Sequence, residues 1–210
     1  MQSCPRPRPR RTGSRAEVEA RPPRRFVETE RRRLFVALEL PEHVRDSLCA
    51  WRSEVMADDL RPVAPEGLHV TLCFLGGRPA DQVPAIAAAC ETALEACSIS
   101  ELGLQAGLWL PRRHPRVLAV RLADPSATLG RAQGALSDAL DRGGWYRPEK
   151  RPFLPHVTVA RIPARARVRA MELPELPPLV FRAPAVTLYR SRLQRTGAVY
   201  EPLASVPVGE

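Results

Sequence analysis

The tetrapeptide His69-Val70-Thr71-Leu72 returns 87 residues later as His156-Val157-Thr158-Val159, with histidine, valine and threonine in the same order. Each copy lies in a short run of apolar and β-branched residues, which predicts a strand. Residues two apart in a strand point to the same face, so each histidine shares a face with its threonine while the aliphatic neighbours face a core. We therefore expect two lobes, each of which presents one such strand to a shared cleft.

Strands and helices are mixed along the chain, and several strands follow one another directly. Apolar runs that end at proline or glycine, such as Gly76-Gly77, predict the strands, and apolar residues at helical spacing predict the helices. Strands are expected at 34–40, 68–75, 102–110, 116–122, 156–162, 179–190 and 199–206, and helices at 41–56, 80–97 and 126–142. Successive strands can pair antiparallel, which favours an α+β class over a doubly wound parallel sheet.

Positive charge is concentrated at the N-terminus. Residues 1–33 contain eleven arginines and four glutamates, so they carry +7 of the net charge of +9 and leave the rest of the chain nearly neutral. Residues 1–31 are rich in Arg and Pro and lack hydrophobic periodicity, which predicts a disordered tail. This tail is either a nucleic-acid-binding arm or a solvated extension, and the global charge of the folded part does not by itself indicate RNA binding.

The remaining chain has the length of one domain. We expect a single two-lobed domain over residues 32–206 and a short C-terminal tail over 207–210. The sequence has no apolar run of about 18 residues and no apolar N-terminal stretch, so neither a membrane span nor a secretory signal is expected. A cytoplasmic monomer is the resulting prediction.

The repeated motif suits acid–base chemistry at phosphorus. Opening a cyclic phosphodiester requires a proton to leave the attacking water and another to reach the departing ribose oxygen, on opposite sides of phosphorus. Histidine titrates near neutral pH, so His69 and His156 can divide these two tasks. The hydroxyls of Thr71 and Thr158 can donate to the phosphate oxygens, where negative charge grows.

Arg161 is a candidate for a phosphate contact with a geometric condition attached. It lies five residues after His156, an odd offset that places its side chain on the opposite face of a regular strand. It therefore reaches the phosphate only if it lies beyond the regular strand or at a bulge, where its guanidinium could make a bidentate contact.

A zinc site is the main rival interpretation of the two histidines. Zinc takes three or four protein ligands, and neither motif has a histidine or aspartate partner at metal-ligand spacing. No nucleophilic serine or cysteine motif and no phosphate-binding glycine loop is present. We therefore expect no metal and no cofactor.

The two motifs resemble the HxTx signatures of the two-histidine (2H) phosphoesterases, and the chain resembles their bacterial RNA 2′,3′-cyclic phosphodiesterases, once described as tRNA 2′–5′ ligases. The resemblance covers residues 32–206. Four segments carry it: the opening strand Arg33–Leu38, the motif segments Leu68–Gly76 and Phe153–Arg161, and a closing hairpin formed by Tyr189–Leu193 and Gly197–Tyr200.

The resemblance implies a bilobal, pseudo-symmetric fold with two mostly antiparallel sheets and outer helices around a central cleft. It implies hydrolysis of an RNA or nucleoside 2′,3′-cyclic phosphate to a 2′-phosphomonoester, with His69 as proton donor to the leaving 3′-oxygen and His156 as the base. Thr71, Thr158 and Arg161 correspond to phosphate contacts. Phe35 and Phe153 are either base-stacking residues or ordinary core aromatics.

Three other functions remain open. The same fold can act on another cyclic phosphate, such as ADP-ribose 1″,2″-cyclic phosphate, or can ligate RNA ends through a 2′–5′ bond. An RNA-binding module with an inactive cleft is the alternative from a different class, and the presence of both histidines and both threonines speaks against it. RNA ends or nucleotides that bear a 2′,3′-cyclic phosphate are therefore the expected partners.

Overall fold

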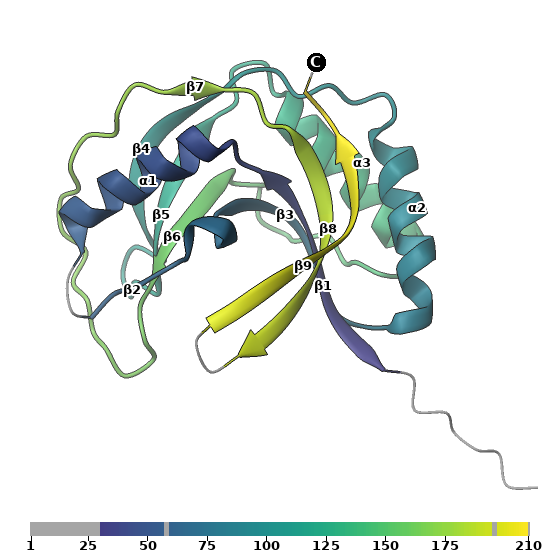
Figure 1. Cartoon of the computed structure of the whole chain (residues 1–210), viewed down its shortest axis with the longest axis horizontal. Coiled ribbons are helices and arrows are strands. Elements are labelled where there is room, and N and C mark those ends of the chain that lie inside the picture. Colours follow the sequence, from purple (N-terminus) through teal and green to yellow (C-terminus); the bar gives the residue numbers. More distant parts are fainter. Residues whose placement is uncertain (1–29, 57–58, 195–196, 210) are drawn as a thin grey trace, which may run out of the picture.

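A computed structural model of the chain describes residues 30–56, 59–194 and 197–209. Strands and helices are mixed as the sequence predicts, so the α+β class is confirmed (Figure 1). The elements are β1 (Arg31–Glu39), α1 (Glu42–Val55), β2 (Arg61–Pro62), β3 (His69–Pro79), α2 (Val83–Leu94), β4 (Leu102–Leu110), β5 (Val117–Ala123), α3 (Thr128–Arg142), β6 (His156–Arg161), β7 (Val180–Phe181), β8 (Ala185–Gln194) and β9 (Gly197–Pro207), with short 3-10 turns at Pro65–Gly67 and Ala80–Gln82.

The strands form two antiparallel groups that meet at one point. Their order is β7-β4-β5-β6-β3-β1-β8-β9, and β2 pairs with the edge of β6. In the part of the chain that the structure describes, the two groups are joined between β3 and β6 through the single pair Val70–Val157. The two sheets implied by the family resemblance are therefore two lobes of one sheet, and both histidine motifs lie at the junction.

Each lobe is covered by a helix that the other lobe contributes. The helix α1 follows β1 of one lobe but packs against β6 of the other, whereas α3 follows β5 and packs against β3 beside α2 (Figure 1). The buried residues Val44, Leu48 and Trp51 recur every three or four positions along α1, which gives it one apolar face. The exchanged helices tie the two lobes into one core.

The two strand faces differ in what covers them. Val70 and Val157 are fully buried on the helix side, together with Val120 of β5. On this side Trp51 lies so close to Gly107 of β4 that an added Cβ would come within 2.8 Å of its ring. The histidine face is the opposite one, and the helices leave it open.

Prolines explain two differences between predicted and observed elements. The helix expected at 80–97 is α-helical only over Val83–Leu94, because Pro84 lacks an N–H group and is tolerated only in the first turn. The strand expected at 179–190 is divided into β7 and β8 around Pro184, which cannot donate to a ladder. The strand expected at 68–75 instead continues through Gly76, whose φ is 72°, to Pro79.

The predicted domain boundaries also change slightly. The first strand begins at Arg31, three residues before its expected start at 34 and one before the expected start of the domain at 32, and residues 1–29 of the predicted disordered tail lie outside the described residues. The predicted C-terminal tail over 207–210 is wrong at its start, because Pro207 ends β9 and Val208 is buried. The Val208 N–H donates to the carbonyl of Pro184, and its own carbonyl accepts from Ile99, each at 3.2 Å. No helix in the described ranges is both long and apolar enough to cross a membrane.

The close approach of Trp51 to Gly107 gives a stability test. In a Gly107→Ala variant the new methyl group would lie 2.8 Å from Trp51 and from Leu173, so we expect the free energy of unfolding to fall by about 1–3 kcal/mol in urea titrations. Gly134→Ala is the matched control, because no atom outside its chain neighbours and the backbone of its own helix lies within 4 Å of that Cβ position in α3. There we expect a gain of about 0.5–1 kcal/mol. A Gly107→Ala variant as stable as the wild type would contradict this packing.

Candidate functional site

The two histidine motifs lie side by side at the junction of the lobes. Because Val70 pairs with Val157 in antiparallel register, the flanking positions set His69 beside Thr158 and Thr71 beside His156, on the face opposite the valines. A pocket of about 30 Å³ lies among them, and it is lined by Val63, Gly67, His69, Thr71, His156, Thr158 and Arg161. The structure thus brings together both histidines, both threonines and the arginine singled out in the sequence.

Each imidazole is fixed by a backbone carbonyl two residues before it. The Nδ1 atom of His156 lies 2.8 Å from the carbonyl oxygen of Leu154, and the ring of His69 hydrogen-bonds the backbone of Gly67. A ring nitrogen that donates to a carbonyl sets the tautomer and leaves the other nitrogen to take or give a proton. Both histidines therefore present one ring nitrogen for chemistry in the same way.

His69 is the more unusual of the two titratable groups. Burial lowers the pKa of His69 to about 4, and the positive charges of Arg161 and His156 act in the same direction, while the hydrogen bond to Gly67 opposes them. In the free protein the His69 imidazole is therefore neutral at pH 7. A titratable group with a strongly shifted pKa in a small pocket is typical of functional sites.

The two threonine hydroxyls have no partner within the described part of the chain. No hydrogen bond joins the side chain of Thr71 or Thr158 to another described residue, although both side chains line the pocket. Hydroxyl groups in this position can donate to a bound anion without breaking an existing bond.

A β-bulge brings Arg161 to the histidine face. The pairing of β5 with β6 shifts register, because Ala119 faces Thr158 whereas Leu118 faces Ala160, so Val159 is the extra residue. Val159 and Ala160 are both buried, and Arg161 is exposed at the pocket. The condition attached to Arg161 in the sequence is therefore met by a bulge.

The first motif contains the same bulge. Ala37 of β1 faces Thr71 whereas Val36 faces Cys73, so Leu72 is the extra residue in β3. Each bulged carbonyl accepts a hydrogen bond from the helix that covers its lobe. Arg52 of α1 donates to Val159 at 3.1 Å, and Gln133 of α3 donates to Leu72 at 3.4 Å. Arg52 and Gln133 are positioning residues that the sequence patterns did not indicate.

The structure buries Phe35, one of the two aromatic residues for which base stacking and core packing were both expected alternatives. Phe35 is 3% exposed, so it offers no free face for a base, and its ring instead lies 5.0 Å from that of His69. The ring of Tyr200 also lies against His69, at 5.2 Å, and Tyr189 stacks on Phe35 at 5.3 Å. As a base-stacking residue Phe35 is thus excluded by its burial in this structure. Phe153 is half-buried against the core, and its role stays a prediction.

Phe74 is an aromatic residue of this face that the sequence reasoning missed. The Leu72 bulge turns Phe74 to the histidine side, just as the Val159 bulge turns Arg161, and each lies five residues after its histidine. Phe74 faces Phe35 across the strands, remains 50% exposed, and has the Arg33 guanidinium 5.7 Å from its ring centre. Phe74 has the same five-residue offset from its histidine as Arg161, so the bulge that the sequence required for Arg161 to reach the pocket face is required for Phe74 as well.

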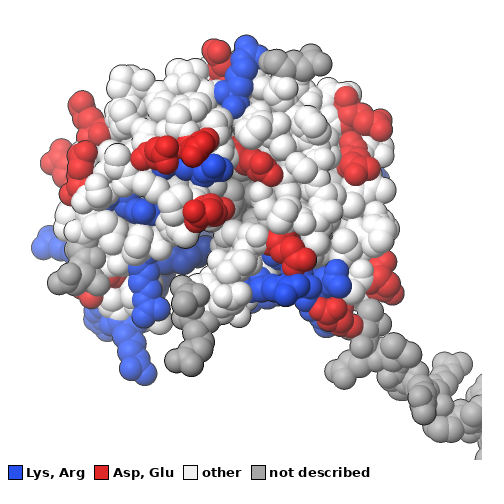
Figure 2. Space-filling view, viewed as in Figure 1, with Lys and Arg blue, Asp and Glu red and all other residues white. Residues whose placement is uncertain are grey.

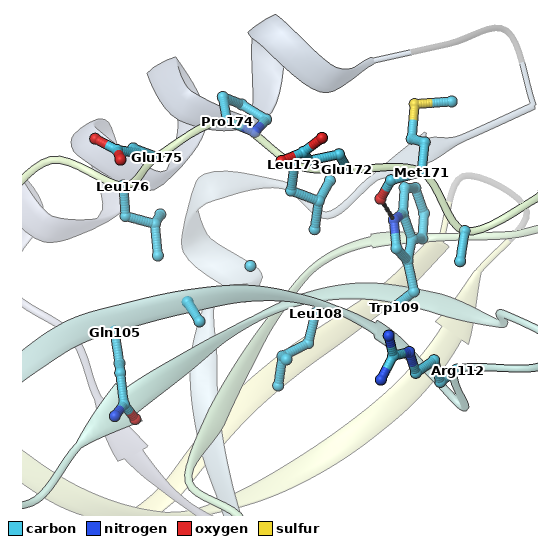
Figure 3. Close-up of a pocket in the computed structure, with 13 residues that line it drawn as sticks. Gln105, Leu108, Trp109, Arg112, Met171, Glu172, Leu173, Pro174, Glu175 and Leu176 are labelled. Atoms are coloured by element: carbon cyan, nitrogen blue, oxygen red, sulfur yellow. Dashed lines mark hydrogen bonds between the residues drawn. The ribbon is translucent and has the colours of Figure 1, made fainter.

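A larger cavity of about 890 Å³ lies away from the histidines. It separates β4 from residues 170–176, as Figure 3 shows, and neither motif contributes to its wall. The indole of Trp109 donates to the carbonyl of Met171 at 2.9 Å and holds the two sides together. In the described ranges, no three His, Cys, Asp or Glu side chains are grouped closely enough to hold a metal ion.

The lowered pKa of His69 has a consequence for stability. The unfolded chain binds a proton at His69 below its ordinary pKa of about 6.5 and the folded chain only below about 4, so acid favours unfolding between these values. Between pH 7 and pH 4.5, we expect the free energy of unfolding of the wild type to fall by about 2–3 kcal/mol more than that of His69→Gln. Urea titrations at both pH values measure this. His43→Gln, at an exposed position of α1, should lose as much as the wild type, and equal losses in all three proteins would contradict the burial of His69.

Comparison with known proteins agrees with this geometry. The RNA 2′,3′-cyclic phosphodiesterase of Escherichia coli K12 is 31% identical over 185 residues, which cover 83% of this chain and 96% of that protein. The RNA 2′,3′-cyclic phosphodiesterase of Thermus thermophilus is also 31% identical, over 81% of this chain and 87% of that protein.

Solved structures of similar proteins also match the fold of this chain. A Thermus thermophilus crystal structure superposes with a TM-score of 0.73 at 28% identity, over 84% of this chain and 97% of that one. Escherichia coli LigT complexed with 3′-AMP superposes with a TM-score of 0.69 at 28% identity, over 85% of this chain and 99% of that one.

A family model provides the assignment. Residues 40–195 match the model described as the 2′-5′ RNA ligase superfamily, which spans both histidine motifs and most of the described structure. The predicted family is confirmed, and the names of the relatives match the predicted class of enzyme. The chain therefore belongs to the 2′-5′ RNA ligase superfamily of two-histidine phosphoesterases.

Proposed function

We propose that this protein hydrolyses 2′,3′-cyclic phosphates at RNA or nucleoside ends to 2′-phosphomonoesters, by acid–base catalysis with His69 and His156 and without a metal. The observation that carries the proposal is the pocket in which two imidazoles, two unpartnered hydroxyls and one guanidinium converge. The relatives named RNA 2′,3′-cyclic phosphodiesterase support the same reaction.

In this mechanism His156 removes a proton from water. Its Nδ1 atom is occupied by the Leu154 carbonyl, so Nε2 accepts the proton as the water oxygen bonds to phosphorus. The bond between phosphorus and the 3′-oxygen breaks on the opposite side, and His69 gives its proton to that oxygen. Water has then been added across the bond, and the phosphate remains on the 2′-oxygen. The family resemblance, rather than the near-symmetric geometry, assigns which histidine gives the proton.

A proton donor must carry its proton, and His69 is neutral in the free protein. A bound cyclic phosphate changes this balance, because its negative charge lies beside the imidazole and offsets the positive charge of Arg161 that helps to lower its pKa. The substrate thus favours the imidazolium form that the reaction requires. Thr71, Thr158 and Arg161 bind the non-bridging oxygens as their charge increases.

The two histidine roles can be separated with a change of leaving group. On a normal 2′,3′-cyclic phosphate, we expect His69→Ala and His156→Ala each to lower kcat about 10²–10⁴-fold, with wild-type activity unchanged by EDTA. A substrate with sulfur at the bridging 3′ position expels a thiolate, which leaves without a proton. His69→Ala should therefore recover most of its loss on the sulfur substrate, whereas His156→Ala should not.

Each result of these assays would contradict a different part of the mechanism. Recovery by His156→Ala alone would reverse the two assigned roles. Full activity of either alanine variant, or inactivation by EDTA, would contradict the mechanism, and a 3′-phosphate product would contradict attack opposite the 3′-oxygen. Parallel assays on ADP-ribose 1″,2″-cyclic phosphate test the alternative substrate.

A further inference from the structure

The size of the pocket limits what it can hold. Its volume of about 30 Å³ is close to the space that one water occupies in the liquid, so it admits phosphate oxygens or a water but not a sugar and a base. Everything in a substrate beyond the reacting phosphate must therefore lie on the surface around the pocket. The charge of that surface determines how much of an RNA chain the protein can bind.

The chemistry of the substrate gives an RNA chain one way out of the pocket. A 2′,3′-cyclic phosphate closes the 3′ end of an RNA, so the rest of the strand continues only from the 5′-oxygen of the terminal ribose. Each further nucleotide on that side adds one phosphate and one negative charge. A surface that binds the strand must therefore begin at the pocket, be basic, and lack carboxylates that compete for its cations.

One surface of the molecule has these properties. Six exposed arginines lie on β2, on the turn before β5 and on the loop after β6, and within the described ranges none of them forms a salt bridge. We refer to these six residues as the arginine surface: Arg61, Arg113, Arg116, Arg165, Arg167 and Arg169.

Arg161 joins the arginine surface to the pocket. It lines the pocket, and on β6 it pairs with Arg61 of β2 on one side and with Val117 of β5, which follows Arg116, on the other. Figure 2 shows Lys and Arg side chains gathered at the lower left, over β2 and the loop after β6. The arginine surface therefore begins where the phosphate-binding side chains end.

The turn before β5 and the loop after β6 are tied to each other. Ile162 donates its N–H to the carbonyl of Arg116 at 2.8 Å, and the Arg116 guanidinium donates to the carbonyl of Ala164 at 3.4 Å. At the far end of the loop the indole of Trp109 donates to the carbonyl of Met171 across the large cavity (Figure 3). The loop is thus anchored at both ends, to the turn before β5 and to β4.

Side chains alternate along the anchored loop. Ala166 and Val168 pack against the core, whereas Arg165, Arg167 and Arg169 are exposed. The alternation directs the three guanidinium groups to solvent from one short segment. They therefore form a row of closely spaced positive charges.

Carboxylates are missing beside these arginines, although they accompany arginines elsewhere. Segments 110–117 and 161–171 contain no acidic residue. On β8, by contrast, Arg190 and Arg192 both pair with Glu201 of β9. Pairing within the fold accounts for the arginines of β8, whereas the arginine surface has cations available for a ligand.

The positive charge is also local. The chain beyond residue 33 is nearly neutral although it includes all six arginines and Arg161, so the rest of that chain is net acidic. A polyanion is attracted to the one basic surface and repelled by acidic ones, which favours a single path across the molecule.

The geometry points to single-stranded RNA as the occupant of the arginine surface: the strand that precedes the cyclic phosphate lies along it, with its phosphates on the guanidinium groups. The inference rests on the proposed function and selects RNA ends over mononucleotides as the preferred substrate. A mononucleotide in the pocket leaves the arginine surface without a ligand, whereas a longer strand binds both. Phosphate contacts carry no sequence information, so binding depends on length and salt rather than on sequence.

A series of substrates of increasing length tests the path. The substrates are 2′,3′-cyclic AMP and oligoadenylates that end in a 2′,3′-cyclic phosphate. For the wild type at low salt we expect kcat/KM to rise with length until the surface is covered. The rise should shrink at high salt, because each phosphate contact releases counterions. Turnover of cyclic AMP with no gain from length would overturn the inference and leave the proposed function intact.

The double variant Arg167→Gln/Arg169→Gln removes two charges from the loop. We expect the ratio of kcat/KM for a long oligoadenylate to that for cyclic AMP to fall several-fold at low salt. The slope of log kcat/KM for the oligoadenylate against log salt should become shallower by about 1–1.5. Arg167→Lys/Arg169→Lys keeps both charges and should retain most of the ratio. The full chain is used throughout, so residues 1–29 contribute equally to every variant.

The matched control is Arg131→Gln/Arg142→Gln, which removes the same charge from exposed positions of α3, the helix that packs against β3 of the other lobe. It should leave the ratio and the slope unchanged. An equal effect of the two Gln double variants, an equal loss on oligoadenylate and cyclic AMP, or an unchanged ratio in Arg167→Gln/Arg169→Gln would each overturn the assignment. A wild type that turns over none of the substrates would instead refute the proposed function.

Discussion

The antiparallel pairing of Val70 with Val157 is the contact on which the site depends. Among the described residues it is the one ladder pair that joins the two strand groups, and it places each histidine beside the threonine of the other motif. A shift of one residue would turn the histidines into the core and the valines into the pocket, because side chains alternate along a strand. Full burial of both valines penalises that shift, so apolar packing on one face fixes the chemistry on the other.

The bulges at Leu72 and Val159 give the two motifs the same local backbone, but they turn outward side chains of different chemistry. Both bulged carbonyls are bound by a side chain from a helix, Gln133 in one lobe and Arg52 in the other. The helix α1 covers the lobe that contains β6, and α3 covers the lobe that contains β3. The bulge in each lobe is therefore stabilised by a helix that follows a strand of the other lobe. The two motifs share this bulge, but the residue turned outward after it is Phe74 in one lobe and Arg161 in the other.

The sequence predicted most strands, the shared face of each histidine and threonine, and their convergence, because these follow from a period of two and from the repeat itself. It did not predict the bulges, since the extra residue is defined by register with Ala37 or Ala119 on a neighbouring strand. The burial of Phe35 was likewise a tertiary outcome. The effects of Pro84 and Pro184 were different, because a missing N–H group is visible in the sequence and both element boundaries follow from it.

The imidazoles of His69 and His156 occupy matching positions in the two motifs but have different surroundings. Rings of Phe35 and Tyr200 enclose His69 at about 5 Å, and this burial is the largest cause of its lowered pKa. Packing of these rings on the His69 side makes the surroundings of the two histidines different, although the two motifs share the same bulge. An anion in the pocket raises the pKa of His69, and by linkage protonated His69 binds that anion more tightly. In the proposed reaction this couples proton uptake by His69 to phosphate binding, so the buried imidazole gains the proton that it donates when the anionic substrate binds.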